Sequence, residues 1–233
     1  MKQDLSPFEN QIQKVSTFEA LVSTPFRGEM NAICWDRNLE GDFAEIVDKF
    51  EITENLEEID LDDLRDLKLS QQGNLAREIL LNDYQLLKDY GASPSLNIIE
   101  FYERDDSFPF FSTDVYSYHV DRSPIPTATF LCTYFGAASE LISNAEAEQK
   151  VLIPEIRAEL RKLFHGNEED FDAFLTENFF DLHYQANELA IPINLGIGNL
   201  WRLAVDHPES KSLPCVHRAP KEKIGEKRLL LIC

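Results

Sequence analysis

Basic residues are scarce in this chain of 233 residues. It has 22 Lys and Arg against 42 Asp and Glu, which gives a formal net charge of −20 at pH 7. A protein that binds nucleic acid needs a basic surface that displaces counterions from the phosphates, and anionic membrane surfaces also attract basic segments. The charge balance therefore argues against nucleic acid and membranes as partners, and a small molecule is the expected one. The sequence carries no indication of an oligomeric state.

Paired cysteines and long apolar runs are also absent. The four cysteines, at positions 34, 132, 215 and 233, lie far apart with no C-x-x-C spacing, which argues against a zinc site built from them. No apolar run approaches the roughly 18 residues that span a bilayer. The opening MKQDLSPFEN lacks the charged and apolar regions of a secretory leader. We therefore expect a cytoplasmic protein with reduced thiols.

The first 95 residues are expected to form a mostly helical region. Apolar residues recur at helical spacing in 41–50 and again in 74–90, and the second stretch stops at Gly91. The strongly acidic stretch 51–66 between them is expected to be a solvated helix or loop face. This region would pack on the rest of the chain as part of a single domain.

From residue 96 the pattern changes to short β-type runs separated by turn residues, which is typical of a sandwich or barrel. These runs lie at 96–102, 114–121, 127–136, 190–205 and 227–233. A helical pattern interrupts them at 143–190, where Pro154 suits the first turn of a helix. The sequence therefore predicts an α+β fold: a β core over 96–233 that carries a helical insertion at about 143–190.

Five histidines are present, and one of them stands in a pattern with chemical meaning. His119 and Asp121 are two residues apart in an expected strand, so both side chains should project to the same face. An imidazole and a carboxylate placed in this way are two thirds of the 2-His-1-carboxylate triad that binds Fe(II) and leaves positions open. An H-x-D pair by itself is a weak signal. His165 and His183, in the insertion, are interpreted as surface or packing residues, and His207 as part of a turn.

The C-terminal segment supplies candidates for the rest of such a site. His217 in PCVHRAP is a second imidazole, and Arg228 follows eleven positions later at the start of an apolar strand. The segment 211–233 has six basic and two acidic residues, so it is positive within an acidic chain. The order H-x-D, distal His, distal Arg resembles the Fe(II)/2-oxoglutarate-dependent oxygenases, in which the distal Arg clamps the far carboxylate of 2-oxoglutarate.

The resemblance extends to the segments around these residues. TFLCTYFGAASEL is similar to the Y-L-N…G-G-E-L segment of that superfamily, with Tyr134 and Glu140-Leu141 as counterparts, and LGIGNLWRL resembles its G-D/N-L turn. More closely, YHVDRSPIPTATFLCTY with VHRAP resembles an uncharacterised bacterial family with the pattern F-H-V-D…L-C-T-Y…V-H-R-S/A-P. The match covers roughly residues 96–233. It implies a double-stranded β-helix (jelly-roll, cupin-like) core.

The resemblance also implies residue roles. His119, Asp121 and His217 would be the iron ligands and the catalytic centre, and Arg228 would bind 2-oxoglutarate. The superfamily's Arg-x-Ser is Arg228-Leu229-Leu230 here, so another hydroxyl, from Tyr134 or Thr133, would have to assist co-substrate binding.

The sequence therefore predicts a non-haem iron dioxygenase that uses Fe(II), 2-oxoglutarate and O2, with succinate and CO2 as co-products. Asp121 favours a hydroxylase over a halogenase, because halogenases of this superfamily replace the carboxylate with a small residue. The insertion, which lies between the two halves of the site, is expected to cover the pocket and set specificity.

Several alternatives remain open at this stage. The chain could be a cupin-like metal-binding or sensory module without turnover, or an interaction protein whose acidic helices bind a basic partner. Arg218 could bind the anion in place of Arg228. Asp121-Arg122 could be a surface ion pair at a strand end.

Overall fold

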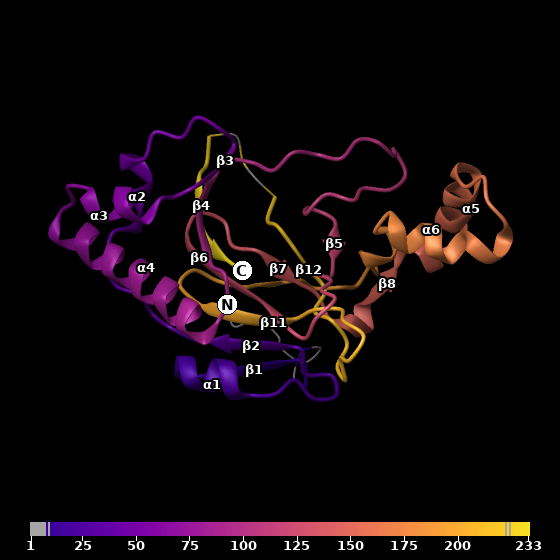
Figure 1. The fold of residues 1–233 in the computed structure, drawn as a ribbon, viewed down its shortest axis with the longest axis horizontal. Helices are drawn as coiled ribbons and strands as arrows, with labels where there is room; N and C mark the ends of the chain where they lie inside the picture. Colours follow the sequence, from indigo (N-terminus) through magenta and orange to yellow (C-terminus); the bar gives the residue numbers. More distant parts are fainter. Residues whose placement is uncertain (1–7, 9, 222, 224) are drawn as a thin grey trace.

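Two mostly antiparallel β-sheets and a set of helices make up the structure (Figure 1). It is a computed structural model that describes residue 8, residues 10–221, residue 223 and residues 225–233. The mixed α+β composition predicted from the sequence is confirmed. Among the described residues, no helix is both long and apolar enough to cross a membrane.

The larger sheet has seven strands. Its order is β1 (Ile12–Val15), β2 (Ala32–Trp35), β11 (Leu200–Ala204), β6 (Ala128–Phe135), β13 (Arg228–Ile232), β4 (Ser95–Ile99) and β3 (Leu56–Glu58). Only β1 and β2 pair in parallel; the other neighbours are antiparallel.

The smaller sheet has six short strands. Its order is β10 (Ile193–Asn194), β7 (Glu140–Leu141), β12 (His217–Arg218), β5 (Tyr118–His119), β9 (His183–Ala186) and β8 (Ala147–Gln149). All of its pairings are antiparallel.

A hydrophobic core lies between the two sheets. Leu131 and Leu230 of the larger sheet belong to one buried cluster with Leu141 and Ile193 of the smaller sheet. Because side chains alternate across a strand, the neighbours Leu229 and Leu231 point to the opposite face of the larger sheet. The strand sequence RLLLI is apolar on both faces because both faces are covered.

Helices cover the outer face of the larger sheet. They are α1 (Phe18–Ser23), α2 (Phe43–Lys49), α3 (Leu61–Asp66) and α4 (Gln71–Tyr90); α2, α3 and α4 lie at the left in Figure 1, and α1 lies at the bottom. The ends of α4 follow from local chemistry. The Ser70 hydroxyl accepts from the amide of Gly73, and Gly91 ends the helix with φ of 97°, where a residue without a Cβ is favoured.

The N-terminal region differs from the predicted helical layer because it also builds the larger sheet. Strands β1 and β2 form one edge of that sheet and β3, from within the acidic stretch, forms the other. Strand β3 is not apparent from the sequence, because its three residues, LEE, include a single apolar residue and that residue is exposed. Pairing with β4 through the backbone, rather than side-chain pattern, makes it a strand.

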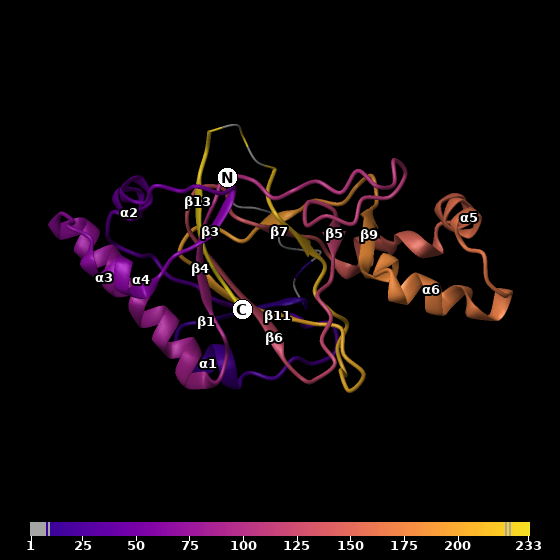
Figure 2. The same ribbon diagram turned by 45° about the horizontal axis from the view of Figure 1, so that its top comes forward.

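The insertion carries the helices predicted for it and, in addition, two strands. Strands β8 and β9 extend the smaller sheet, and helices α5 (Pro154–Leu163) and α6 (Phe171–Glu177) lie beyond that edge in both views (Figure 2). The short 3-10 helices nearby are η2 (Asn144–Glu146), η3 (Lys150–Leu152), η4 (Glu168–Asp170) and η5 (Phe180–Leu182). A separate aromatic cluster that includes Phe111, Phe171 and Phe180 holds this part together.

Candidate metal centre

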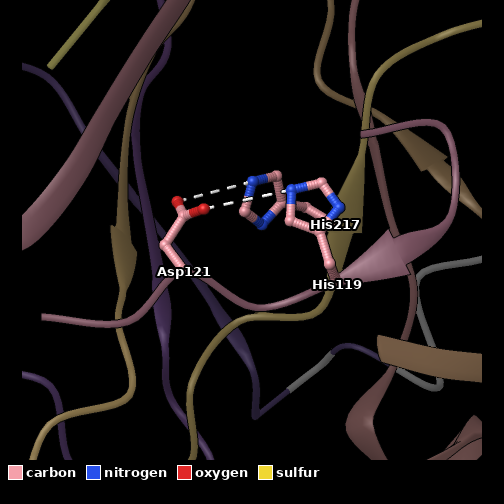
Figure 3. Close-up of side chains that lie close together, drawn as sticks. All are labelled: His119, Asp121 and His217. Carbon is pink, nitrogen blue, oxygen red and sulfur yellow. Dashed lines mark ion pairs between the residues drawn. The ribbon is translucent and has the colours of Figure 1, made fainter. Parts of the chain in front are cut away.

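Three side chains converge at the smaller sheet: His119 from β5, Asp121 just after β5, and His217 from β12 (Figure 3). One ligand atom from each lies within 4.8 Å of the others. Nε2 of His119 is 3.9 Å from Oδ1 of Asp121, and Nε2 of His217 is 3.6 Å from Oδ2. Atoms at these separations can all reach a single ion placed between them, since bonds from a metal to nitrogen or oxygen are about 2.0–2.2 Å long.

Strand register brings the two imidazoles together. His217 of β12 is directly opposite His119 of β5, and their ring centroids are 4.6 Å apart. His217 is also opposite Leu141, which belongs to the core between the sheets, so the imidazoles face that same inter-sheet space. Strand β5 ends at His119, so Asp121 reaches the site from the residue after Val120 rather than from a continuing strand.

Both imidazoles are oriented by the backbone two residues earlier in the chain. Nδ1 of His119 is 2.8 Å from the carbonyl oxygen of Ser117, and Nδ1 of His217 is 3.2 Å from that of Cys215. A carbonyl oxygen only accepts, so each Nδ1 carries a hydrogen, and in the neutral form of such a ring the lone pair is on Nε2, the nitrogen nearer Asp121. This is the arrangement usual for histidines that bind metals.

The protonation states of the site also suit a metal ion. Burial lowers the pKa of His119 to about 4, and the neighbouring His217 lowers it further. Burial alone would raise the pKa of Asp121, but His217 and the hydroxyl of Thr129 outweigh it, and the pKa is lowered. At neutral pH the cluster therefore offers a neutral His119 imidazole and an ionised carboxylate, which are the forms that bind metals.

Arg228 lies on the opposite wall of the inter-sheet space. It is two residues from Leu230 on β13 and therefore shares its inward face. The side chain is buried, and its Nη2 donates to Oγ of Ser139 at 3.3 Å. Gly136 makes room for it: with φ of 83°, a Cβ there would lie 2.3 Å from the carbonyl oxygen of Lys227 and 3.0 Å from Cγ of Arg228.

The two hydroxyls considered for co-substrate binding point to opposite faces of β6. Thr133 is buried on the same face as Leu131, toward the space between the sheets. Tyr134 packs into the core under the helices, stacked on Phe43, and its hydroxyl donates to Asp83 at 2.7 Å. The structure therefore brings Thr133, and not Tyr134, to the face that carries Arg228.

The other arginines considered in the sequence are engaged elsewhere. Arg218 pairs with Glu140 at 2.7 Å and lies over the Tyr118 ring, one position off the inward-facing His217. Arg122 pairs with Asp181 at 2.5 Å and with Asp206 at 2.8 Å, so the ion pair considered between Asp121 and Arg122 is not the one that forms.

Two residues of the site were not recognised in the sequence. Thr129 of β6 donates its hydroxyl to Oδ2 of Asp121 and so fixes the carboxylate. His183, interpreted as a packing or surface residue of the insertion, is buried on β9 directly opposite His119. The run HYQA at 183–186 forms a strand, and only the pairing of that strand with β5 reveals the position of His183.

The donor set fits a divalent transition metal with open positions, because two imidazoles and one carboxylate leave part of its coordination sphere free. Comparisons with protein-family models, curated proteins and solved structures find no match to this chain.

Proposed function

We propose that this protein is an Fe(II)- and 2-oxoglutarate-dependent oxygenase with a double-stranded β-helix core. The observation that carries the proposal is the convergence of His119, Asp121 and His217 on one face of the smaller sheet, with a buried Arg228 on the inward face of the larger one. Two facing sheets that enclose the ligands support the jelly-roll arrangement that the sequence resembles.

Each residue has a role that follows from its chemistry. His119, Asp121 and His217 would hold Fe(II) on one side and leave the remaining positions for the 2-oxo acid and O2. Arg228 would bind the far carboxylate of 2-oxoglutarate through paired N–H donors, a geometry that Lys cannot reproduce. Thr133, on the same face, would add a hydroxyl donor in place of the missing Ser.

Bound Fe(II), with 2-oxoglutarate and O2 as co-substrates, would supply the oxidising chemistry, with succinate and CO2 as co-products. The protein's own contribution is to fix the ligands before substrate arrives: Ser117 and Cys215 orient the imidazoles, and Thr129 orients the carboxylate. Because Asp121 is present, hydroxylation of a small molecule is favoured over halogenation.

An anaerobic optical titration tests this proposal. Fe(II) with 2-oxoglutarate should produce a weak visible charge-transfer band in the wild-type protein, and the band should be lost in Asp121→Ala. Asp206→Ala, which removes a carboxylate from the Arg122 pair instead, is the matched control and should retain the band.

The titration also separates the alternatives. Fe(II) binding without any dependence of the spectrum on 2-oxoglutarate would contradict the oxygenase and favour the cupin-like metal-binding module. Absence of any metal binding would contradict both and leave the interaction protein.

A further inference from the structure

Three histidines form a single row across the smaller sheet. His217 of β12 is opposite His119 of β5, and His119 is opposite His183 of β9. Residues directly opposite in an antiparallel sheet project to the same face. His183 therefore stands beside the metal centre, on the side of His119 away from His217, with its ring centroid 6.0 Å from that of His119.

One ring nitrogen of His183 makes no hydrogen bond to the described part of the protein. The residue is 5 % exposed, and its Nδ1 is buried without a hydrogen-bond partner among the residues that the structure describes. Its ring is nearly perpendicular to that of Phe111, and the two centroids are 5.9 Å apart. A buried polar atom without a hydrogen-bond partner lowers the stability of the folded protein. A bound ligand that pairs with this nitrogen would remove that cost.

Lys150 continues the row at the next strand. Gln149, the last residue of β8, is opposite Tyr184, so the adjacent Lys150 comes level with His183. Its ammonium lies over the Phe111 ring and donates to the hydroxyl of Ser117 at 2.7 Å and to the carbonyl oxygen of Ser112 at 3.3 Å.

These partners of Lys150 are neutral oxygens. Within the described part of the chain, no carboxylate lies within ion-pairing distance of Lys150. An ammonium that is partly buried without a counterion is unfavourable, and an anionic ligand would remove that cost.

The nearby acids are already engaged by the loop before β5. Asp114 accepts from the backbone amides of Tyr116 and Ser117 at 3.0 and 3.3 Å, and Arg104 approaches it at 4.0 Å. Asp105 accepts from Thr113 and from the amide of Ser107. These bonds hold both carboxylates within the loop and do not supply Lys150 with a direct ion pair.

We propose that His183 and Lys150, both contributed by the insertion, form the substrate-binding end of the site and take the carboxylate of a small carboxylic acid. The single ammonium matches a group of charge −1, and the imidazole matches an oxygen acceptor, which favours a carboxylate over a phosphate dianion. This inference rests on the proposed function in one respect, since it takes the metal between His119, Asp121 and His217 as the reacting end.

The spacing between the residues of the row also indicates the length of the substrate. Adjacent strands are about 4.8 Å apart, so Lys150 stands on the order of 10 Å from His119 along the row. A carboxylate held there places a carbon a few bonds along the substrate near the metal centre, which suits a compact acid rather than a peptide chain.

A binding experiment with matched acids and amides tests the inference. The probes are butyrate, hexanoate, octanoate and phenylacetate, each compared with its primary amide, and binding to the full chain is measured by calorimetry and saturation-transfer NMR. Every titration is run both with and without 2-oxoglutarate, so that occupation of Arg228 and competition at the proposed site can be told apart, and both with Zn(II) and without metal.

We expect at least one acid to bind at least about tenfold more tightly than its amide. The preference should be lost in His183→Phe and in Lys150→Met. It should survive in His165→Phe and Lys162→Met, which make the same changes at exposed positions of the insertion. His183→Gln, which keeps a polar side chain at the buried position, serves as a second variant, with circular dichroism as the check on folding.

Acids that bind no better than their amides would overturn the inference, as would a preference that survives substitution of both His183 and Lys150. Failure of the proposed function has a different signature. In that case Fe(II) or 2-oxoglutarate fails to give the optical band, while the preference for acids is still measurable in the metal-free titrations.

Discussion

At the scale of single residues, the candidate site depends on the groups that orient the three metal-binding side chains as much as on those side chains themselves. Two backbone carbonyls orient the imidazoles and one hydroxyl orients the carboxylate. Outer partners of this kind contribute to metal affinity because they fix the direction of the lone pairs before the metal arrives.

Replacing Thr129 tests that contribution. Thr129→Val removes the hydroxyl that donates to Asp121 and keeps the shape of the side chain. We expect metal affinity to fall about 10- to 100-fold, the usual effect of losing an outer partner of a ligand. Competition with a chromophoric chelator for Co(II) measures it. Thr129→Ser restores the donor and should restore affinity; equal losses in both variants would show that the hydroxyl is not responsible.

Replacing Arg228 tests the co-substrate clamp. Arg228→Lys keeps the charge but loses the paired donors, so the Kd for 2-oxoglutarate should rise about 10- to 100-fold, as expected when a charged hydrogen bond worth about 1.5–3 kcal/mol is lost. Calorimetry of the metal-loaded protein measures the change. Arg218→Lys, next to a ligand but paired with Glu140, should bind 2-oxoglutarate as the wild type does. A larger rise in Kd in Arg218→Lys than in Arg228→Lys would show that Arg218, and not Arg228, binds 2-oxoglutarate.

At the scale of elements, helix α4 is fixed to the larger sheet by a buried polar network. Asp83 of α4 accepts two hydrogen bonds from Arg37, each 2.7 Å long, and one from Tyr134. Burial raises the pKa of Tyr134 well above its usual value, so the phenol stays protonated and donates. Tyr134 therefore links the helical layer to the strand whose other face carries Thr133 and Thr129.

Asp83→Ala should unfold the protein more readily. The substitution leaves the Arg37 guanidinium buried without its partner carboxylate, and breaking a buried ion pair in this way costs about 3–5 kcal/mol. Urea denaturation followed by circular dichroism measures the change in the free energy of unfolding. Asp89→Ala on the same helix, where the carboxylate is exposed, is the control and should lie close to the wild type. A loss of less than about 1 kcal/mol in Asp83→Ala would contradict the structural role given to the network.

Some helices and strands could be predicted from sequence patterns alone. Helix α4 was predictable because its apolar spacing and Gly91 are local signals. Strands β4, β6 and β13 were predictable because they are long enough for a β-type composition to stand out. Strand β3 has no such composition, since it exists through pairing with β4, and the β-type run expected at 114–121 forms a strand only at Tyr118–His119.

At the scale of the whole molecule, the charge of −20 acts on stability as well as on partners. Like charges repel within a compact molecule, and salt screens the repulsion. Between about 0.01 and 0.1 M salt the Debye length falls from about 30 to about 10 Å. Over that range we expect the stability of the folded chain to increase.

Thermal unfolding in NaCl measures this effect. A gain of about 1 kcal/mol corresponds to a rise in Tm of about 2–4 °C for a chain of this size. KCl at equal concentration should give the same rise, since screening depends on ionic strength and not on the ion. An unchanged or lower Tm in both salts would show that self-repulsion does not limit stability.

The insertion contributes to the smaller sheet and also to the candidate site. Its strands β8 and β9 extend the sheet that carries His119 and His217, and they place His183 in line with them. The expectation that the insertion covers the pocket and sets specificity stays a prediction, and the acid-binding experiment addresses its second half.

The sequence by itself determined the classes of partner that the charge disfavours, the mixed α+β composition and the candidate set His119, Asp121, His217 and Arg228. It could do so because composition, spacing within one strand and motif order are local properties of the chain. Only the tertiary structure decided that His217 stands opposite His119, that Tyr134 faces the helices while Thr133 faces the inter-sheet space, and that His183 and Lys150 extend the row. Strand register and the choice of face depend on pairing between segments far apart in the chain, and a shift of one residue would turn every side chain to the other side.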